Sequence, residues 1–164
     1  MLVALYIGPH TADTFLVRAS WKTIRLVQKG PLDIVTHVEA IHAVHSDGRV
    51  TIASSSLRDK GVRAKIVRLN VDNWIIVDVP QWSVQKSIYW FDYHDGDAYD
   101  TRGALATVLP GKGSSDRWFC NEAVGASVGL LHPETFGPNQ FAAIALTLGT
   151  NITTEFFSNM GNLS

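Results

Sequence analysis

Three side chains in this sequence have the types and spacing needed for nucleophilic chemistry. Cys120, the single cysteine among 164 residues, stands at the predicted start of a helix, and His37 and Glu39 stand two residues apart in an apolar strand. A free thiol has a pKa of about 8.5, so only a small fraction is the nucleophilic thiolate at neutral pH. A helix N-terminus and a neighbouring imidazolium both lower that pKa. Cys120 and His37 are therefore a candidate nucleophile and base.

The surroundings of Cys120 leave two interpretations open. A thiol packs well as a small hydrophobic group, so Cys120 could simply fill the core. However, Cys120 precedes the inner face of its helix, and Asn121 and Glu122 follow it. An acidic residue in the first turn favours a helix N-terminus. On these residues alone, nucleophile and core filler have similar weight.

His37 and Glu39 are expected to share one face of their strand, because strand side chains alternate. Their Cα atoms would lie about 7 Å apart, which permits a direct hydrogen bond. Glu39 could then orient the imidazole or stabilise its positive charge. The alternative is a half-buried histidine whose role is structural.

Other site chemistries find little support in the sequence. Zinc sites need three or four convergent ligands, and no ligand set of suitable spacing is present. Asp95, Asp97 and Asp100 miss the spacing of a calcium loop, and we interpret them as solvated turn residues. The segment 111–115 resembles a phosphate-binding loop only in composition. We therefore expect no metal and no cofactor.

The composition predicts one globular domain over residues 1–164. Hydrophobic residues make up 46% of the chain, and 14 basic against 15 acidic residues give a net charge of −1. Such a balance gives no support for nucleic acid or a membrane surface as the partner. One cysteine allows no internal disulfide. The apolar segment 1–8 is too short for a signal peptide and is predicted to be a strand, and no transmembrane span is expected.

Periodicity and turn residues predict the elements that must position the candidate side chains. Asp47-Gly48 predicts a hairpin turn between strands at 34–44 and 50–54. The Cys120 helix is predicted to run to Leu131, with that leucine on its inner face. Further helices are predicted at 14–28 and 81–94, further strands at 65–70 and 74–79, and a helix or buried strand at 141–148. This order predicts an α+β fold, with a polar tail from Gly149 that is partly loose.

Five short motifs follow one another within residues 1–140. They are Thr36-His37-Val38-Glu39-Ala40, Asp47-Gly48, the segment from Ala53 to Arg63, Tyr99-Asp100-Thr101-Arg102-Gly103, and Trp118-Phe119-Cys120-Asn121-Glu122. Together they resemble the permuted branch of the NlpC-type papain-like cysteine hydrolases, which occur in bacteria and bacteriophages. The histidine strand precedes the cysteine helix here, as in that branch. The resemblance implies a circularly permuted papain-like fold, in which a small antiparallel sheet packs against the helix carrying the nucleophilic cysteine.

The resemblance assigns His37 as base and Cys120 as nucleophile. Papain-like relatives often take a third polar residue from the strand after the histidine strand, where this chain has no carboxylate. Glu39 is therefore the chosen third catalytic residue, with Ser54 and Ser56 as reserve candidates. The activity implied is hydrolysis of amide bonds, with peptide or isopeptide bonds of the bacterial cell wall as substrate.

Several neighbouring residues are given supporting roles. Glu122 is expected to cap its helix or brace a loop, and Tyr99 to pack beside the site. Arg58, Asp59 and Arg63 are interpreted as a structural lock of their loop or as a substrate rim. Without a predicted signal peptide, we expect a cytoplasmic or phage-associated protein, and the oligomeric state is left open.

Two rival functions remain open on the sequence. A related branch of the same fold, typified by lecithin:retinol acyltransferase, transfers acyl chains on lipids. A non-enzymatic structural or inhibitory module is the second rival. The polar loops predicted near Cys120 favour a polar amide substrate over a lipid.

Overall fold

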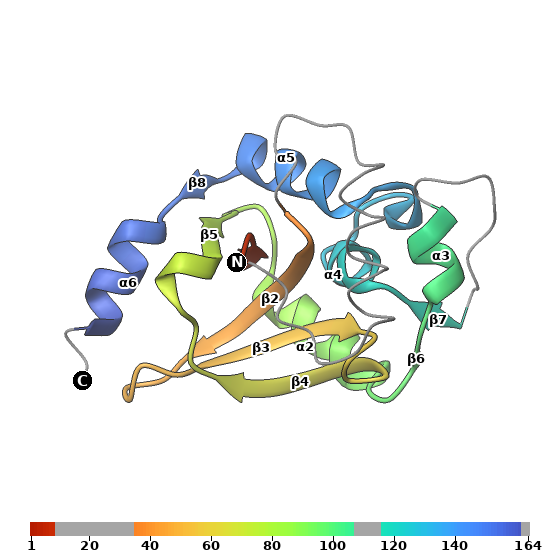
Figure 1. The fold of residues 1–164 in the computed structure, drawn as a ribbon, viewed down its shortest axis with the longest axis horizontal. Helices are drawn as coiled ribbons and strands as arrows, with labels where there is room; N and C mark the ends of the chain where they lie inside the picture. The colour runs from red at the N-terminus through yellow and green to blue at the C-terminus, as the bar shows by residue number, and fades with distance from the viewer. Residues whose placement is uncertain (9–34, 107–115, 162–164) are drawn as a thin grey trace.

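The structure of this chain, a computed structural model, describes residues 1–8, 35–106 and 116–161 (Figure 1). The predicted helix at 14–28 and the predicted loop at 111–115 lie outside these ranges. The described residues combine one curled sheet with five α-helices and two short 3-10 turns, so the α+β prediction is confirmed.

One sheet of eight strands runs through the described residues in the order β7-β6-β4-β3-β2-β1-β5-β8. Its strands are Leu2–Tyr6 (β1), His37–Val44 (β2), Val50–Ser56 (β3), Gly61–Val67 (β4), Trp74–Asp78 (β5), Ala98–Tyr99 (β6), Arg117–Trp118 (β7) and Thr150–Asn151 (β8). Neighbouring strands are antiparallel, except that β6 and β7 are parallel. The strand that carries His37 therefore lies inside the sheet, between β1 and β3.

The helices cover both faces of this sheet. They are Val84–Tyr93 (α2), Thr101–Ala106 (α3), Cys120–Ser127 (α4), Pro138–Leu148 (α5) and Thr153–Gly161 (α6), with 3-10 turns at Val71–Asn73 (η1) and Pro133–Thr135 (η2). No helix among the described residues is long and apolar enough to cross a bilayer. Helix α4 contacts β2 and β3, whereas α6 contacts β5 (Figure 1).

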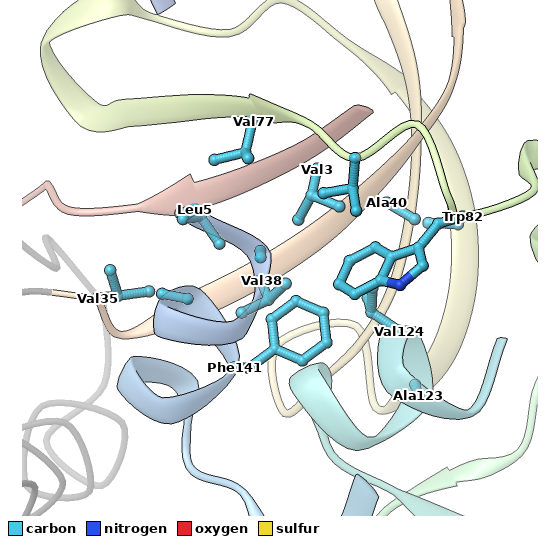
Figure 2. Packing of buried hydrophobic residues seen from close by; sticks show 14 of the residues in the cluster. Val3, Leu5, Val35, Val38, Ala40, Val77, Trp82, Ala123, Val124 and Phe141 are labelled. Atoms are coloured by element: carbon cyan, nitrogen blue, oxygen red, sulfur yellow. The ribbon is translucent and has the colours of Figure 1, made fainter. Parts of the chain in front are cut away.

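Alternating side chains of the strands divide the interior into two apolar clusters. The larger one, between the sheet and α2, α4 and α5, is here called the inner cluster. Figure 2 shows Val3 and Leu5 of β1 meeting Phe141 of α5 and Val124 of α4, and all four side chains are fully buried. The smaller one, here called the outer cluster, contains Ala4 of the same strand. Because Ala4 points away from its neighbours, the two clusters lie on opposite sides of β1.

The predicted hairpin is present where Asp47-Gly48 stands. Gly48 has a φ of +75°, which glycine adopts without strain, and the Asp47 carboxylate accepts hydrogen bonds from the backbone N–H and Nε of Arg49. A second glycine brings β6 close to β4. A Cβ on Gly61 would lie 1.9 Å from the carbonyl oxygen of Asp97, so only glycine permits this approach.

Several predicted boundaries shift, and each shift has a local cause. Helix α2 begins at Val84 rather than at 81, because the Ser83 side chain accepts a hydrogen bond from the N–H of Lys86. Helix α4 ends at Ser127, where Gly129 turns with a φ of +80°. The prediction that Leu131 lies on the inner face is wrong, since Leu131 is 83% exposed.

The C-terminal segment differs from the partly loose tail predicted from its polarity. Residues 150–161 form β8, which pairs with β5, and the amphipathic helix α6. Phe156 and Met160 of α6 are each 6% exposed and belong to the outer cluster. Two apolar residues one helical turn apart are enough to anchor an otherwise polar segment.

Candidate active site

The first turn of α4 positions Cys120. Phe119 precedes the helix in an extended conformation, and its N–H donates to the Glu122 carboxylate at 3.2 Å, which confirms the predicted capping role of Glu122. Cys120 is the first helical residue and is 4% exposed. Its thiol lies 3.7 Å from Oδ1 of Asn121, whose Nδ2 donates to the carbonyl of Phe136. The side chain next to Cys120 is thus held in place from a second loop.

The first residue of β2 brings His37 to the same place. His37 Nε2 lies 2.8 Å from Oε1 of Glu39, so the hydrogen bond permitted by their spacing is present. The side chain of His37 is 13% exposed and that of Glu39 only 3%. The imidazole therefore stands at the rim of the site, and the carboxylate lies behind it.

Cys120 on α4 interacts with His37 on β2. Burial alone would lower the pKa of His37, but the charge of Glu39, and the charge and side-chain hydrogen bond of Cys120, raise it to about 9. His37 thus has side-chain hydrogen bonds to both Glu39 and Cys120. The structure thus brings all three predicted residues, Cys120, His37 and Glu39, into one hydrogen-bonded row.

Glu39 is ionised in this row. Burial alone would raise the pKa of Glu39, but the charges and hydrogen bonds of His37 and Arg63 outweigh burial and hold that pKa at about 2. At neutral pH the row consequently contains an imidazolium facing a carboxylate. An imidazolium is the partner that stabilises a thiolate.

Ser54 and Ser56, the reserve candidates, have other partners. The hydroxyl of Ser54 donates to the carbonyl of Val38 at 2.7 Å, and that of Ser56 donates to the Asp59 carboxylate at 2.9 Å. Neither of these two hydrogen bonds involves His37. Glu39, in contrast, bonds the imidazole at 2.8 Å.

Arg63 is the residue of this site whose partner the sequence does not reveal. Its guanidinium donates from both terminal nitrogens to the two oxygens of Glu39, at 2.8 and 2.6 Å. Its Nε donates to Asp59 at 2.6 Å. Of the two predicted roles, this contact pattern matches the structural lock, and it extends the lock to Glu39.

Of the three acidic residues that the sequence predicted to be solvated turn residues, Asp95 is exposed in the turn after α2, whereas Asp97 and Asp100 have specific partners. Asp100 is 2% exposed and accepts a hydrogen bond from the N–H of Gly103. Asp97 accepts from Trp118 Nε1 at 3.1 Å and bonds Nδ1 of His94 at 2.7 Å. These carboxylates hold the strands that lead to Cys120, because β6 carries Tyr99 and β7 carries Trp118. A count of charges in a turn cannot reveal the bond of Asp97 to Trp118, which lies 21 residues away.

Tyr99 packs near the nucleophile, as predicted. Burial and the nearby negative charges of Cys120, Asp100 and Glu122 all raise the pKa of its phenol. Burial, together with Asp100 and Glu134, likewise raises the pKa of Glu122 to about 7, against the effect of its bond to Phe119. The neighbourhood of the thiol on the α4 side is therefore acidic, and His37 is the cation that faces it.

Metal ligation finds no basis in the residues that the structure describes. Within residues 1–8, 35–106 and 116–161, no three or more histidine, cysteine or carboxylate side chains are grouped so that they could hold an ion.

No protein-family model matches the chain, and comparisons with curated proteins and with solved structures found no match.

Proposed function

We propose that this protein is a cysteine hydrolase that cleaves amide bonds, with Cys120 as nucleophile, His37 as base and acid, and Glu39 as the residue that orients the imidazole. The observation that carries the proposal is the double contact of His37, which bonds Glu39 and interacts with Cys120. A nucleophile, a base and an orienting group in hydrogen-bond contact are the arrangement that nucleophilic catalysis requires.

The proposed reaction runs through a thioester. Transfer of the Cys120 proton to His37 gives a thiolate–imidazolium pair, and the thiolate adds to the amide carbonyl carbon. Backbone N–H groups in the first turn of α4, which lack acceptors within a helix, stabilise the oxyanion. The C–N bond then breaks as imidazolium gives its proton to the leaving amine. Water attacks the thioester while His37 takes a proton from it, and the products are a carboxylic acid and the regenerated thiol.

The order of elements supports the finer fold assignment within this proposal. The histidine strand β2 precedes the cysteine helix α4 along the chain, and α4 contacts both β2 and β3. A permuted papain-like domain of the NlpC type would have this arrangement. The proposed substrate class, peptide or isopeptide bonds of the bacterial cell wall, rests on the resemblance of the five motifs.

Product analysis tests the proposal against lipid acyl transfer. The protein is incubated separately with muropeptides and with short-chain phospholipid, and the products are identified by mass. We expect new free amines from muropeptides, and none with Cys120→Ala, because the acyl group must pass through the sulfur. A lasting fatty-acyl mass on Cys120, with muropeptides intact, would contradict the proposal.

The pH dependence of alkylation tests the activated thiol directly. The rate of iodoacetamide alkylation should rise at a pH well below the value of about 8.5 expected for a free thiol. His37→Ala should move that profile back towards the free-thiol value. An ordinary thiol profile in the unmutated protein would favour the non-enzymatic module.

A further inference from the structure

The carboxylate of Glu39 has two cationic partners, and it shares one oxygen between them. Oε1 lies 2.8 Å from His37 Nε2 and 2.6 Å from a terminal nitrogen of Arg63. Oε2 accepts from the other terminal nitrogen at 2.8 Å. Such a two-pronged bond fixes the plane of a carboxylate as well as its position. The direction in which Oε1 faces His37 is therefore set by Arg63.

Arg63 reaches Glu39 across an intervening strand. Arg63 on β4 pairs with Ser54 on β3, and the β3–β2 pair of Ala53 with Ala40 puts Ser54 level with Glu39. The small serine side chain turns to the carbonyl of Val38, which leaves room for the guanidinium. The row Arg63–Ser54–Glu39 is thus a feature of the sheet register rather than of one loop.

A second carboxylate holds Arg63 from outside. One oxygen of Asp59 accepts from Arg63 Nε at 2.6 Å, from Lys65 Nζ at 2.7 Å and from the hydroxyl of Ser56 at 2.9 Å. The side chain of Arg63 is 12% exposed, so little water can replace these bonds. All three nitrogens of the guanidinium therefore donate to a carboxylate, two to Glu39 and one to Asp59.

We propose that Arg63 is a positioning residue that keeps Glu39 ionised and facing His37 in both protonation states of the imidazole. The inference deepens the proposed function and rests on it for its catalytic meaning. When His37 is an imidazolium, Glu39 has two positive partners. When His37 has given its proton to the leaving amine, Arg63 is the cation still bonded to Glu39 in the described structure.

The cost of an uncompensated buried charge explains why this matters. A carboxylate that is 3% exposed is strongly disfavoured without a cation beside it. Without Arg63, a neutral imidazole would leave Glu39 as a buried carboxylate with no cation bonded to it. His37 would therefore hold its proton more tightly. Proton donation to the leaving amine, and proton uptake from water in the second step, both need the imidazole to alternate freely.

Several charged and titratable groups surround this pair among the described residues. His37 faces Glu39 and Cys120, and Tyr6 stands opposite His37 on β1. Arg63 faces Glu39 and Asp59. Tyr99 interacts with Cys120. Removal of the guanidinium charge should therefore act on His37 through Glu39.

The test measures the pKa of the His37 ring by NMR in a Cys120→Ala background, which removes the effect of the thiol on the ring. Arg63→Met should raise that pKa by about 1 unit or more, and Arg63→Lys, which keeps the charge, should leave it near the parent value. Arg49→Met is the matched control, because Arg49 pairs with Asp47 in an exposed turn. If Arg63→Met does not fold, Arg63→Gln keeps donors for Glu39 without the charge and takes its place.

Turnover provides the second measurement. With Cys120 present, Arg63→Met should lower turnover about tenfold or more near neutral pH, and activity should recover as the pH rises towards the new His37 pKa. An equal loss at every pH, or a His37 pKa that is unchanged or lower, would overturn the inference. If the unmutated protein cleaves no amide yet the His37 pKa rises in Arg63→Met, the proposed hydrolase fails while the positioning role stands.

Discussion

The contact between His37 and Glu39 follows from their positions two residues apart in one strand. Two residues on one face of a strand are close enough to bond, and the structure has this bond at 2.8 Å. The thiol of Cys120 is a second hydrogen-bond partner of the imidazole. The catalytic assignment of Glu39 is a prediction that kinetics can test.

Glu39→Gln removes the charge but keeps the shape of the side chain. Turnover should fall about tenfold or more, because a neutral amide stabilises an imidazolium less than a carboxylate does. The fold should persist, since Arg63 retains Asp59 as an anionic partner. Kinetics of Glu39→Gln beside Ser54→Ala and Ser56→Ala check the assignment. A large loss in a serine variant with a silent Glu39→Gln would make that serine the third residue.

Spacing along the chain could predict the contact of His37 with Glu39 but not that of Arg63 with Glu39. Arg63 is 24 residues from Glu39 and two strands away, so the contact exists only once the register of β2, β3 and β4 is known. The same applies to the bond between Asp97 and Trp118 of β7, which lies 21 residues away. Long-range partners of charged side chains depend on sheet order, which composition and periodicity do not specify.

For helix α4, the sequence predicts one end of the element but not the other. Its start could be predicted, because Glu122 stands where it can cap the N–H of Phe119. Its end could not, because the apolar spacing continues to Leu131 while Gly129 turns the chain away. A left-handed glycine stops the helix before hydrophobic periodicity does.

The capping carboxylate of α4 makes the stability of the protein depend on pH. Burial and the charges of Asp100 and Glu134 raise the pKa of Glu122 to about 7, above the value of about 4.5 in an unfolded chain. Between these two values the folded chain binds the proton more tightly, so this residue's contribution to the free energy of unfolding falls as the pH rises. The ionised group is the destabilising one.

Glu122→Gln should therefore stabilise the protein at pH 8 and not at pH 4. The amide oxygen can still accept from Phe119, so the cap is kept while the charge is removed. We expect a gain of roughly 1–3 kcal/mol at pH 8, from about 1.4 kcal/mol per unit of pKa shift. Chemical denaturation at both pH values measures it, with Glu155→Gln on an exposed position of α6 as control. An equal effect of Glu122→Gln at both pH values would show that charge is not the cause.

At the scale of the whole molecule, the sequence predicts an α+β fold and most strands. It does not predict that residues 150–161 pack against the sheet. The strands follow from alternating apolar residues and from the Asp47-Gly48 turn, both of which are local signals. The role of residues 150–161 depends instead on the far side of the sheet. Ala4 of β1 and Ile76 of β5 point to that side of the sheet. Helix α6 covers them with Phe156 and Met160.

This arrangement predicts that α6 stabilises the fold without taking part in the chemistry. Phe156→Ala removes a ring that is 6% exposed from the outer cluster, and a buried phenylalanine truncated to alanine costs about 3–5 kcal/mol. Helix α4, which carries Cys120, contributes Ala123 and Val124 to the inner cluster on the opposite side of the sheet, so the alkylation profile of Cys120 should persist below the lowered melting temperature. Thermal unfolding of Phe156→Ala is compared with Asn159→Ala, an exposed position on the same helix. If both variants melt like the parent protein, α6 adds nothing to stability, and if the thiol profile changes with the melting temperature, the two faces of the sheet are coupled.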